Sequence, residues 1–331
     1  MKLHENIDLY KDAITATSQQ MGIPEIYVEK DYWVTLALYN IFSSEVGSQA
    51  VFKGGTALSK CFKIIDRFSV DIDIVILKSG SESGNQLKNK IKKISKVVTA
   101  ILPEIEVPGI TNKFGMIRKT AHRYQKNFDG QFGQVRDNII LEATWLGSFE
   151  PYTKAMVSSF VSDMMNKTGQ SALIIKYNLQ PFQVQVLSKE RTLCEKIMSL
   201  VRFSFTENPI IDLNNKVRHI YDIHKLLTEI GMKDFFISKR FESMLLTVAN
   251  DDVISFKDND WLANHPSTAL IFSDRNNTWN QIRNTYLTTF SELVYGVLPT
   301  EEEILITLYQ ISERLKPINW IIGDTGITRN R

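Results

Sequence analysis

The stretch at positions 52–76, FKGGTALSKCFKIIDRFSVDIDIVI, constrains the fold of this chain more than any other part of the sequence. A Gly-Gly-Thr turn opens it, and a run long enough for about two helical turns follows. The stretch closes on Asp71 and Asp73, which lie in an apolar, β-branched run typical of a buried strand. Because side chains alternate along a strand, the two carboxylates should project from the same face, about 7 Å apart.

This combination predicts a site for a cation and for phosphates. Two carboxylates beside an apolar core repel one another unless a positive charge lies between them, and Mg²⁺ usually takes one or two carboxylates together with substrate phosphates. Glycines before a helix allow close backbone approach, and the helix N-terminus offers N–H groups to a phosphate. Taken singly, an Asp-x-Asp pair is more often a solvated edge, and Gly-Gly is usually only a turn. The order strand, Gly-Gly turn, helix and Asp-x-Asp strand favours the combined site.

That order resembles the core of the nucleotidyltransferase fold shared with DNA polymerase β. The longer string GGTALSKCFKIIDRFSVDIDI is similar to the AbiEii/AbiGii family, the nucleotidyltransferase-like toxins of type IV toxin–antitoxin systems. The resemblance implies a bacterial toxin of abortive infection that uses a nucleoside triphosphate with Mg²⁺ or Mn²⁺. It also implies tRNA or another RNA as acceptor, and an antitoxin as partner. Two features differ from the wider superfamily. Gly54-Gly55 stands where Gly-Ser is common, so Thr56 must supply any hydroxyl, and the fifteen residues between Gly55 and Asp71 are more than is usual.

The composition bounds the class of protein. With 331 residues, 43% hydrophobic and 23% charged, the chain can bury a core in one large domain or two modest ones. Its net charge of +2 implies no partner by itself. Cys61 and Cys194 lack metal-ligand spacing and fit reduced thiols, which predicts a cytoplasmic protein. The polar start MKLHENIDLYKDAI predicts no signal peptide, and no apolar run is long enough to predict a membrane span.

Hydrophobic periodicity predicts further elements on both sides of the central stretch. Helices are expected at 5–20, 25–43 and 86–102, strands at 50–53, 113–125, 137–146 and 181–187, and mixed helix and loop at 151–180. The strands at 113–125 and 137–146 would pair across the turn DGQFG. In the second of these, Glu142 lies in an apolar run. Polymerase-β-like transferases use a third carboxylate there to deprotonate the attacking hydroxyl, so the resemblance makes Glu142 a candidate base. The alternative is a charge at the sheet end or one paired with an arginine.

Two groups of charges allow more than one interpretation. Glu29, Lys30 and Asp31 are expected on the polar surface of the helix at 25–43, although the string VEKDYWV also recurs in the family's N-terminal region. From Gln86 to Phe128 there are ten Lys or Arg and two acidic residues. The lysines of the helix at 86–102 could form a basic wall for a polyanion or a solvated helix face.

Two later helices carry further candidate residues. In the helix that begins at Ser188, Lys196 lies close to the apolar stripe. A lysine there is more often a surface residue with its stem packed down, but ERTLCEKIMSLVR matches the family's third motif, which implies that Lys196 holds the triphosphate. In the helix at 216–230, Asp222 matches the second aspartate of the fourth motif, and His219 stands where the first would be. The alternative for Asp222 is an ion pair with Arg218, four residues earlier on the same helix.

The sequence therefore predicts an α/β (α+β) fold with a small mixed sheet of the nucleotidyltransferase type. Residues 1–187 would form the core, and residues 188–331 a helical domain that contributes to the cleft. The predicted activity is metal-dependent nucleotidyl transfer, with an acceptor that is RNA, or else a protein hydroxyl or a small molecule. A catalytically silent nucleotide- or RNA-binding protein is the alternative from another class. The metal ligands would be Asp71 and Asp73, the catalytic set would add Glu142, Lys196 and Asp222, and nucleotide contacts would come from Lys53, Gly54, Gly55, Thr56, Arg67, Ser69 and Lys196.

Overall fold

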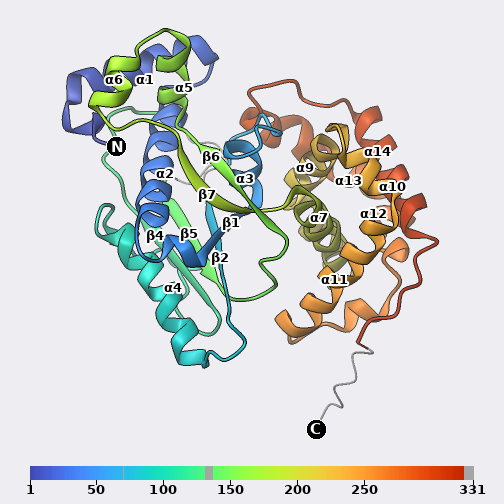
Figure 1. Cartoon of the computed structure of the whole chain (residues 1–331). Coiled ribbons are helices and arrows are strands. Elements are labelled where there is room, and N and C mark those ends of the chain that lie inside the picture. Colours follow the sequence, from blue (N-terminus) through green and yellow to red (C-terminus); the bar gives the residue numbers. More distant parts are fainter. Residues whose placement is uncertain (70, 131–136, 324–331) are drawn as a thin grey trace. The chain divides into compact units, whose positions relative to one another are not determined.

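The structure is a computed structural model that describes residues 1–69, 71–130 and 137–323 (Figure 1). It contains two compact units, Met1–Leu187 and Ser188–Arg331, and each is described by itself below. The turn DGQFG, expected between two strands, lies in part outside the described residues. None of the helices in the described ranges combines the length and the apolar character that a membrane span requires.

Within the described residues, a seven-stranded mixed sheet forms the centre of the first unit, in the order β3-β4-β5-β2-β1-β7-β6. The strands are β1 (Ala50–Lys53), β2 (Ile72–Ile76), β3 (Glu104–Ile105), β4 (Ile117–His122), β5 (Ile139–Thr144), β6 (Tyr152–Val157) and β7 (Phe182–Leu187). The pairs β2–β5 and β1–β7 are parallel, and the other neighbours are antiparallel. The predicted α/β class with a mixed sheet is confirmed.

Strand β6 was not predicted, because residues 151–180 were expected to be helix and loop. All six residues of β6 pair antiparallel with β7. Its sequence, YTKAMV, lacks the apolar alternation that marks a strand with one face in the core. Accordingly, five of its six side chains are not buried. Pairing with β7, rather than burial of its own side chains, therefore determines the conformation of this edge strand.

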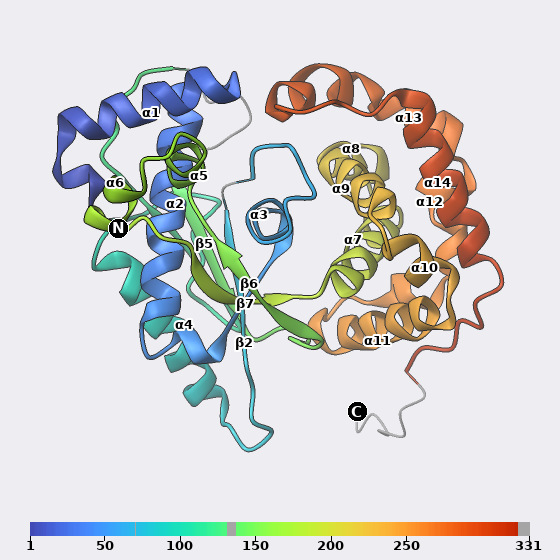
Figure 2. The same ribbon diagram turned by 45° about the horizontal axis from the view of Figure 1, so that its top comes forward.

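Helices lie on both sides of the sheet in the first unit. They are α1 (Ile7–Met21), α2 (Glu25–Ser43), α3 (Gly54–Lys60), α4 (Gly84–Thr99), α5 (Phe160–Lys167) and α6 (Ser171–Lys176), with short 3₁₀ turns at Leu3–Glu5 and Gly47–Gln49. Figure 2 shows α2 and α4 on one side of the sheet and α3 on the other. Helix α4 begins with a capping box, in which Ser83 and Gln86 each satisfy the other's backbone N–H.

The expectation that Glu29, Lys30 and Asp31 form a surface triplet is wrong. Their exposed fractions are 1%, 0% and 4%. The cause is that α2 packs against α1, α4, α5 and β7, so that neighbouring elements cover it on several sides. A buried charge is costly unless it is paired or hydrogen-bonded. The Glu29 carboxylate accepts hydrogen bonds from the backbone and side-chain nitrogens of Asn127, at 2.9 and 3.0 Å, and burial still raises its pKa.

The described residues of the second unit form helices and no strand, as the sequence predicted for this part of the fold. The α-helices are α7 (Lys189–Phe203), α8 (Pro209–Asn214), α9 (Val217–Thr228), α10 (Met232–Ile237), α11 (Lys239–Ser255), α12 (Leu270–Ser273), α13 (Arg275–Thr285) and α14 (Glu301–Leu315). The amphipathic pattern at 279–298 does not form one continuous α-helix, because α13 passes into a π-helical turn at Tyr286–Phe290. Three β-branched residues, Thr285, Thr288 and Thr289, favour the α-helix only weakly there.

Candidate active site

The Gly-Gly turn lies directly between β1 and α3, against the second aspartate of the Asp-x-Asp motif. Gly54 is the first residue of α3 and has φ of +80°, a left-handed conformation that favours glycine. A Cβ at this position would overlap the Asp73 carboxylate. The backbone of Gly54 therefore approaches this carboxylate more closely than any residue with a side chain could.

Gly55 makes a second close approach, to two candidate nucleotide contacts. A Cβ on Gly55 would lie 2.5 Å from Nη2 of Arg67 and 2.8 Å from Oγ of Ser69. Arg67 is almost fully buried, and its Nη1 donates to the backbone carbonyl of Phe68 at 3.0 Å. Four of the residues predicted to contact the nucleotide (Gly54, Gly55, Arg67 and Ser69) are thus grouped at the start of α3.

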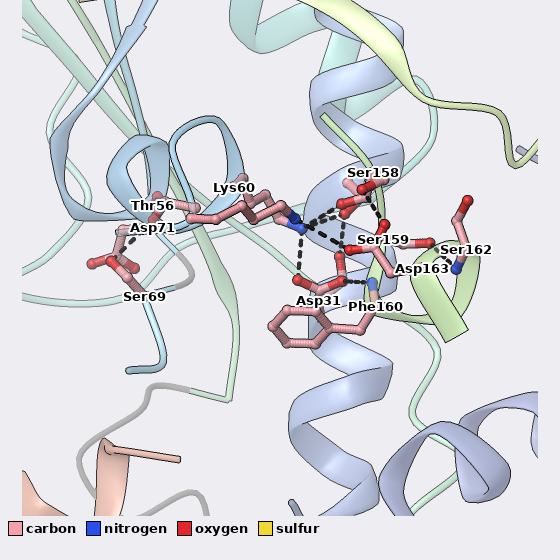
Figure 3. A network of polar contacts seen from close by, with 12 residues as sticks. Asp31, Thr56, Lys60, Ser69, Asp71, Ser158, Ser159, Phe160, Ser162 and Asp163 are labelled. Atoms are coloured by element: carbon pink, nitrogen blue, oxygen red, sulfur yellow. Dashed lines mark hydrogen bonds and ion pairs between the residues drawn. The ribbon is translucent and has the colours of Figure 1, made fainter. Parts of the chain in front are cut away.

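The hydroxyl of Thr56, expected to face a phosphate, is used inside the protein. It donates to the backbone carbonyl of Asp71 at 2.5 Å and lies 3.1 Å from the Ser69 hydroxyl (Figure 3). Only 1% of Thr56 is exposed. Its contacts join the first turn of α3 to the segment that leads into β2, so Thr56 is placed to position Asp71 relative to the Gly-Gly turn.

The sheet register aligns four charged residues in one row across four strands. Lys53 on β1 pairs with Asp73 on β2, Asp73 with Glu142 on β5, and Glu142 with Lys119 on β4. Residues directly opposite one another on paired strands project to the same face. The row therefore has two carboxylates in the middle and a lysine at each end. Nζ of Lys119 lies 3.1 Å from Oε2 of Glu142, which forms an ion pair.

Electrostatics in this row favour a bound cation. Burial, with the Glu142 and Asp71 carboxylates nearby, raises the pKa of Asp73 to about 7. Asp71 itself precedes β2 by one residue, so it lies at the strand's entrance rather than within it. A divalent cation stabilises neighbouring carboxylates that otherwise repel one another. Asp71 and Asp73 have the hard oxygen donors that Mg²⁺ or Mn²⁺ prefers.

In the described ranges, no three side chains of His, Cys, Asp or Glu are already grouped as a complete ligand set. The residues present still fit Mg²⁺, since this ion is commonly held by one or two carboxylates plus substrate phosphates. The backbone of Gly54, the first residue of α3, lies directly against the Asp73 carboxylate.

A buried ion pair at the other end of α3 was missed in the sequence. Nζ of Lys60, the last residue of α3, lies 2.6 Å from Oδ1 of Asp31 and 2.7 Å from Oγ1 of Thr35, both on α2. It also lies 3.3 Å from the carbonyl oxygen of Ser158 (Figure 3). All three ammonium protons thus have an acceptor. Burial lowers the pKa of Lys60, and Asp31 counters this effect.

The other oxygen of Asp31 extends this network to α5. Oδ2 accepts a hydrogen bond of 2.9 Å from the backbone N–H of Phe160, the first residue of α5. The network therefore holds the end of the Gly-Gly helix against α2 and α5. The signal that could have revealed it is the presence of charged residues inside mostly apolar strings, ALSKCF around Lys60 and DYWV from Asp31 onward.

In the second unit, the two remaining candidates form an ion pair with each other. Nζ of Lys196 on α7 lies 2.7 Å from Oδ2 of Asp222 on α9, and the side chains are 8% and 0% exposed. Neither was expected to be a core residue, and this expectation is wrong. Both helices turn their buried faces toward each other, so the two charges are paired inside the helical unit.

Comparisons with known proteins identify the class and then the family. The family model described as nucleotidyl transferase AbiEii toxin, type IV TA system, matches residues 36–302, which is well over half of the chain. The chain belongs to this family of nucleotidyltransferase toxins, and the resemblance found in the sequence is confirmed. No curated protein gave a significant match.

Among solved structures, the chain is similar to MenT4, a nucleotidyltransferase toxin from Mycobacterium tuberculosis H37Rv, with 13% sequence identity and a TM-score of 0.44. That match covers 89% of this chain and 97% of MenT4.

Proposed function

We propose that this protein transfers a nucleotidyl group from a nucleoside triphosphate to a hydroxyl of an RNA acceptor, with tRNA as the foremost candidate. The observation that carries the proposal is the row of Asp73 and Glu142 on adjacent strands, with the backbone of Gly54 against the Asp73 carboxylate. Membership of the nucleotidyltransferase toxin family supports the same chemistry.

In this proposal the nucleotide site is built around the start of α3. Gly54 and Gly55 cradle the triphosphate, while Lys53, Arg67 and Ser69 supply charge and hydrogen bonds close to the two glycines. Thr56 acts as a positioning residue through its hydrogen bond to Asp71. Asp71 and Asp73 would hold Mg²⁺ or Mn²⁺, and the bound cation would neutralise charge on the phosphates.

The proposed reaction balances with one proton transfer. The acceptor hydroxyl attacks the α-phosphorus, a new oxygen–phosphorus bond forms, and the bond to the β-phosphate breaks, which releases pyrophosphate. Glu142 takes the proton of the hydroxyl as general base, for which a position beside Asp73 on the neighbouring strand is suitable. Lys119, 3.1 Å from Glu142, holds this carboxylate in place before the substrate arrives.

Lys196 and Asp222 are the candidate functional residues of the second unit. The family's third motif implies a triphosphate contact for Lys196, a role that suits its point charge, and Asp222 would orient Lys196 through the 2.7 Å ion pair. As the toxin of a type IV system, the protein would act in the cytoplasm and be neutralised by an antitoxin.

The test is incubation of the protein with each radiolabelled nucleoside triphosphate, Mg²⁺ and total cell lysate. Label should enter small RNA, and this transfer should be lost in Asp73→Asn and Glu142→Gln. Glu106→Gln removes an exposed carboxylate outside the row and serves as the matched control. Label in protein or in a small molecule would overturn the RNA acceptor. Triphosphate binding with no transfer from any nucleotide would show a silent binding protein instead.

A further inference from the structure

Helix α4 separates two grooves that differ in charge. The first lies between α4 and β4, has a volume of about 470 Å³, and is lined by Lys88, Lys92, Lys113 and Arg118 together with the amides of Asn85 and Asn89. None of its described lining residues is acidic. We call it the α4–β4 groove. Four cations on one concave surface create a positive potential that single surface lysines do not.

The groove on the other side of α4 has a balanced charge. It has a volume of about 300 Å³ and is lined by Lys90 and Lys93, but also by Glu45 and Glu82. Lys90 forms an ion pair with Glu82 and donates to the carbonyl of Leu77 at 3.1 Å. The lysines of α4 are therefore not one uniform basic wall, because only those in the α4–β4 groove face further cations.

Local contacts fix the two cations that come from outside α4. Nε of Arg118 donates to the hydroxyl of the buried Ser95 at 2.6 Å. Its Nη2 lies 3.9 Å from Oε2 of Glu104, while Lys113 lies 2.5 Å from Oε1 of the same residue. The Glu104 carboxylate is thus shared by Arg118 and Lys113. Together with Lys88 and Lys92, these cations leave the groove with an excess of positive charge.

The α4–β4 groove and the candidate active site share strand β4. Arg118 points to α4, whereas the next residue, Lys119, pairs with Glu142 in the charged row. Successive side chains of a strand lie on opposite faces. The groove and the row therefore lie on opposite faces of the sheet, and a ligand that contacts both must pass around its edge, where β3 and the bridge from Asn112 to Lys119 lie outside β4. A mononucleotide is too short for this.

We propose that the α4–β4 groove binds the phosphate backbone of the nucleic-acid acceptor. The identification of this ligand as the acceptor rests on the proposed function. Lys88 and Lys92 stand one helical turn apart on the same side of α4 and are exposed, so both can contact phosphates. Neutralised phosphates release counterions, which makes such binding strong and salt-dependent.

The lining favours nucleic acid over a protein partner. Protein interfaces depend on buried aromatic or aliphatic anchors, and no aromatic side chain is found among the described lining residues of the groove. Unpaired bases also need aromatic platforms. The lining itself offers cations and amides to the phosphate backbone, and such contacts depend little on the sequence of the RNA.

The experiment measures binding of a fluorescein-labelled RNA hairpin by anisotropy over a series of KCl concentrations. The test variant of the full chain is Lys88→Gln/Lys92→Gln. The matched control is Lys93→Gln/Lys96→Gln, which removes two exposed lysines from the same helix. Glutamine is nearly as good a helix former as lysine, so all variants should fold and melt alike.

The test variant should lose about two units from the slope of log affinity against log salt, and the control much less than one. Equal losses in both variants would overturn the proposal in favour of a diffuse charge effect, and no loss in either would show a solvated face. Competition by poly-glutamate as effective as that by unlabelled RNA would assign the groove to an acidic protein.

The outcome for the groove can be separated from the outcome for the reaction. Asp73→Asn should keep the full salt dependence of RNA binding while losing nucleotidyl transfer. A chain that binds the hairpin through Lys88 and Lys92 but transfers no label would refute the proposed function alone. A chain that transfers label to RNA with an unchanged salt slope in the test variant would refute the groove alone.

Discussion

The buried pair of Lys196 and Asp222 can be tested so that its effects on stability and on activity are measured separately. The two side chains are 8% and 0% exposed and 2.7 Å apart, so removal of either partner takes away the counter-ion next to a buried charge. This costs roughly 3–5 kcal/mol of the free energy of unfolding. For a unit of this size, Lys196→Met or Asp222→Ala should lower the melting temperature by about 10 °C or more.

The double variant Lys196→Met/Asp222→Val should restore most of the lost stability. Replacing a buried ion pair by apolar groups of similar volume is often neutral or stabilising. If Lys196 holds the triphosphate, the double variant should nevertheless lose transfer by about ten- to hundredfold or more, since a charge-assisted contact contributes roughly 1.5–3 kcal/mol. Lys233→Met, at an exposed lysine, is the control and should change stability by less than about 0.5 kcal/mol.

The assay combines thermal melting with label transfer measured well below the lowest melting temperature. A double variant that folds and transfers label normally would show that the pair is only scaffold. Single variants that melt like the wild type would refute the argument from burial.

Three further outcomes are expected. Lys60→Met should destabilise the protein by about 3–5 kcal/mol, because it leaves Asp31 buried without its cation. It should also raise the KM for the triphosphate, and a normal KM would show that the anchoring of α3 does not matter for the nucleotide. Gly54→Ala should abolish transfer, because its Cβ would overlap the Asp73 carboxylate. The control Gly109→Ala, at a glycine with φ of +74° and nothing within 4 Å of the added Cβ, should show only backbone strain, and equal activities of the two variants would contradict the close-approach argument. EDTA should stop transfer and Mg²⁺ or Mn²⁺ should restore it, with circular dichroism showing the fold intact throughout; transfer that continues in EDTA would contradict metal dependence.

Local patterns predicted the elements that bury an apolar face. The bounds expected for the helix at 25–43 match α2 to the residue, and the strands β1, β2, β5 and β7 lie where apolar runs predicted them. Helix α7 begins after Ser188, as expected, and the Ser188 side chain caps it by accepting from the N–H of Arg191. These features depend on neighbours within a few residues, which is the information that periodicity and capping rules use.

Tertiary pairing was needed for the rest. The row of Lys53, Asp73, Glu142 and Lys119 depends on the register of four strands, which no single strand encodes. The sequence placed Asp71 and Asp73 together and suggested Glu142, but it could not show that lysines close the row at both ends. The burial of Glu29, Lys30 and Asp31 was missed for a related reason, since the elements that cover α2 come from distant parts of the chain.

The contact between Asp31 and Lys60 sets a limit on how short an expressed fragment of this protein can be. The family match begins at residue 36. A fragment trimmed to that boundary would keep Lys60 but lose Asp31 and Thr35, two of the three groups that accept its protons. It would also cut α2 in half and remove the acceptor for the first N–H of α5. A fragment intended for biochemical work should therefore begin before Glu25, because the boundary of sequence similarity falls inside a buried polar network.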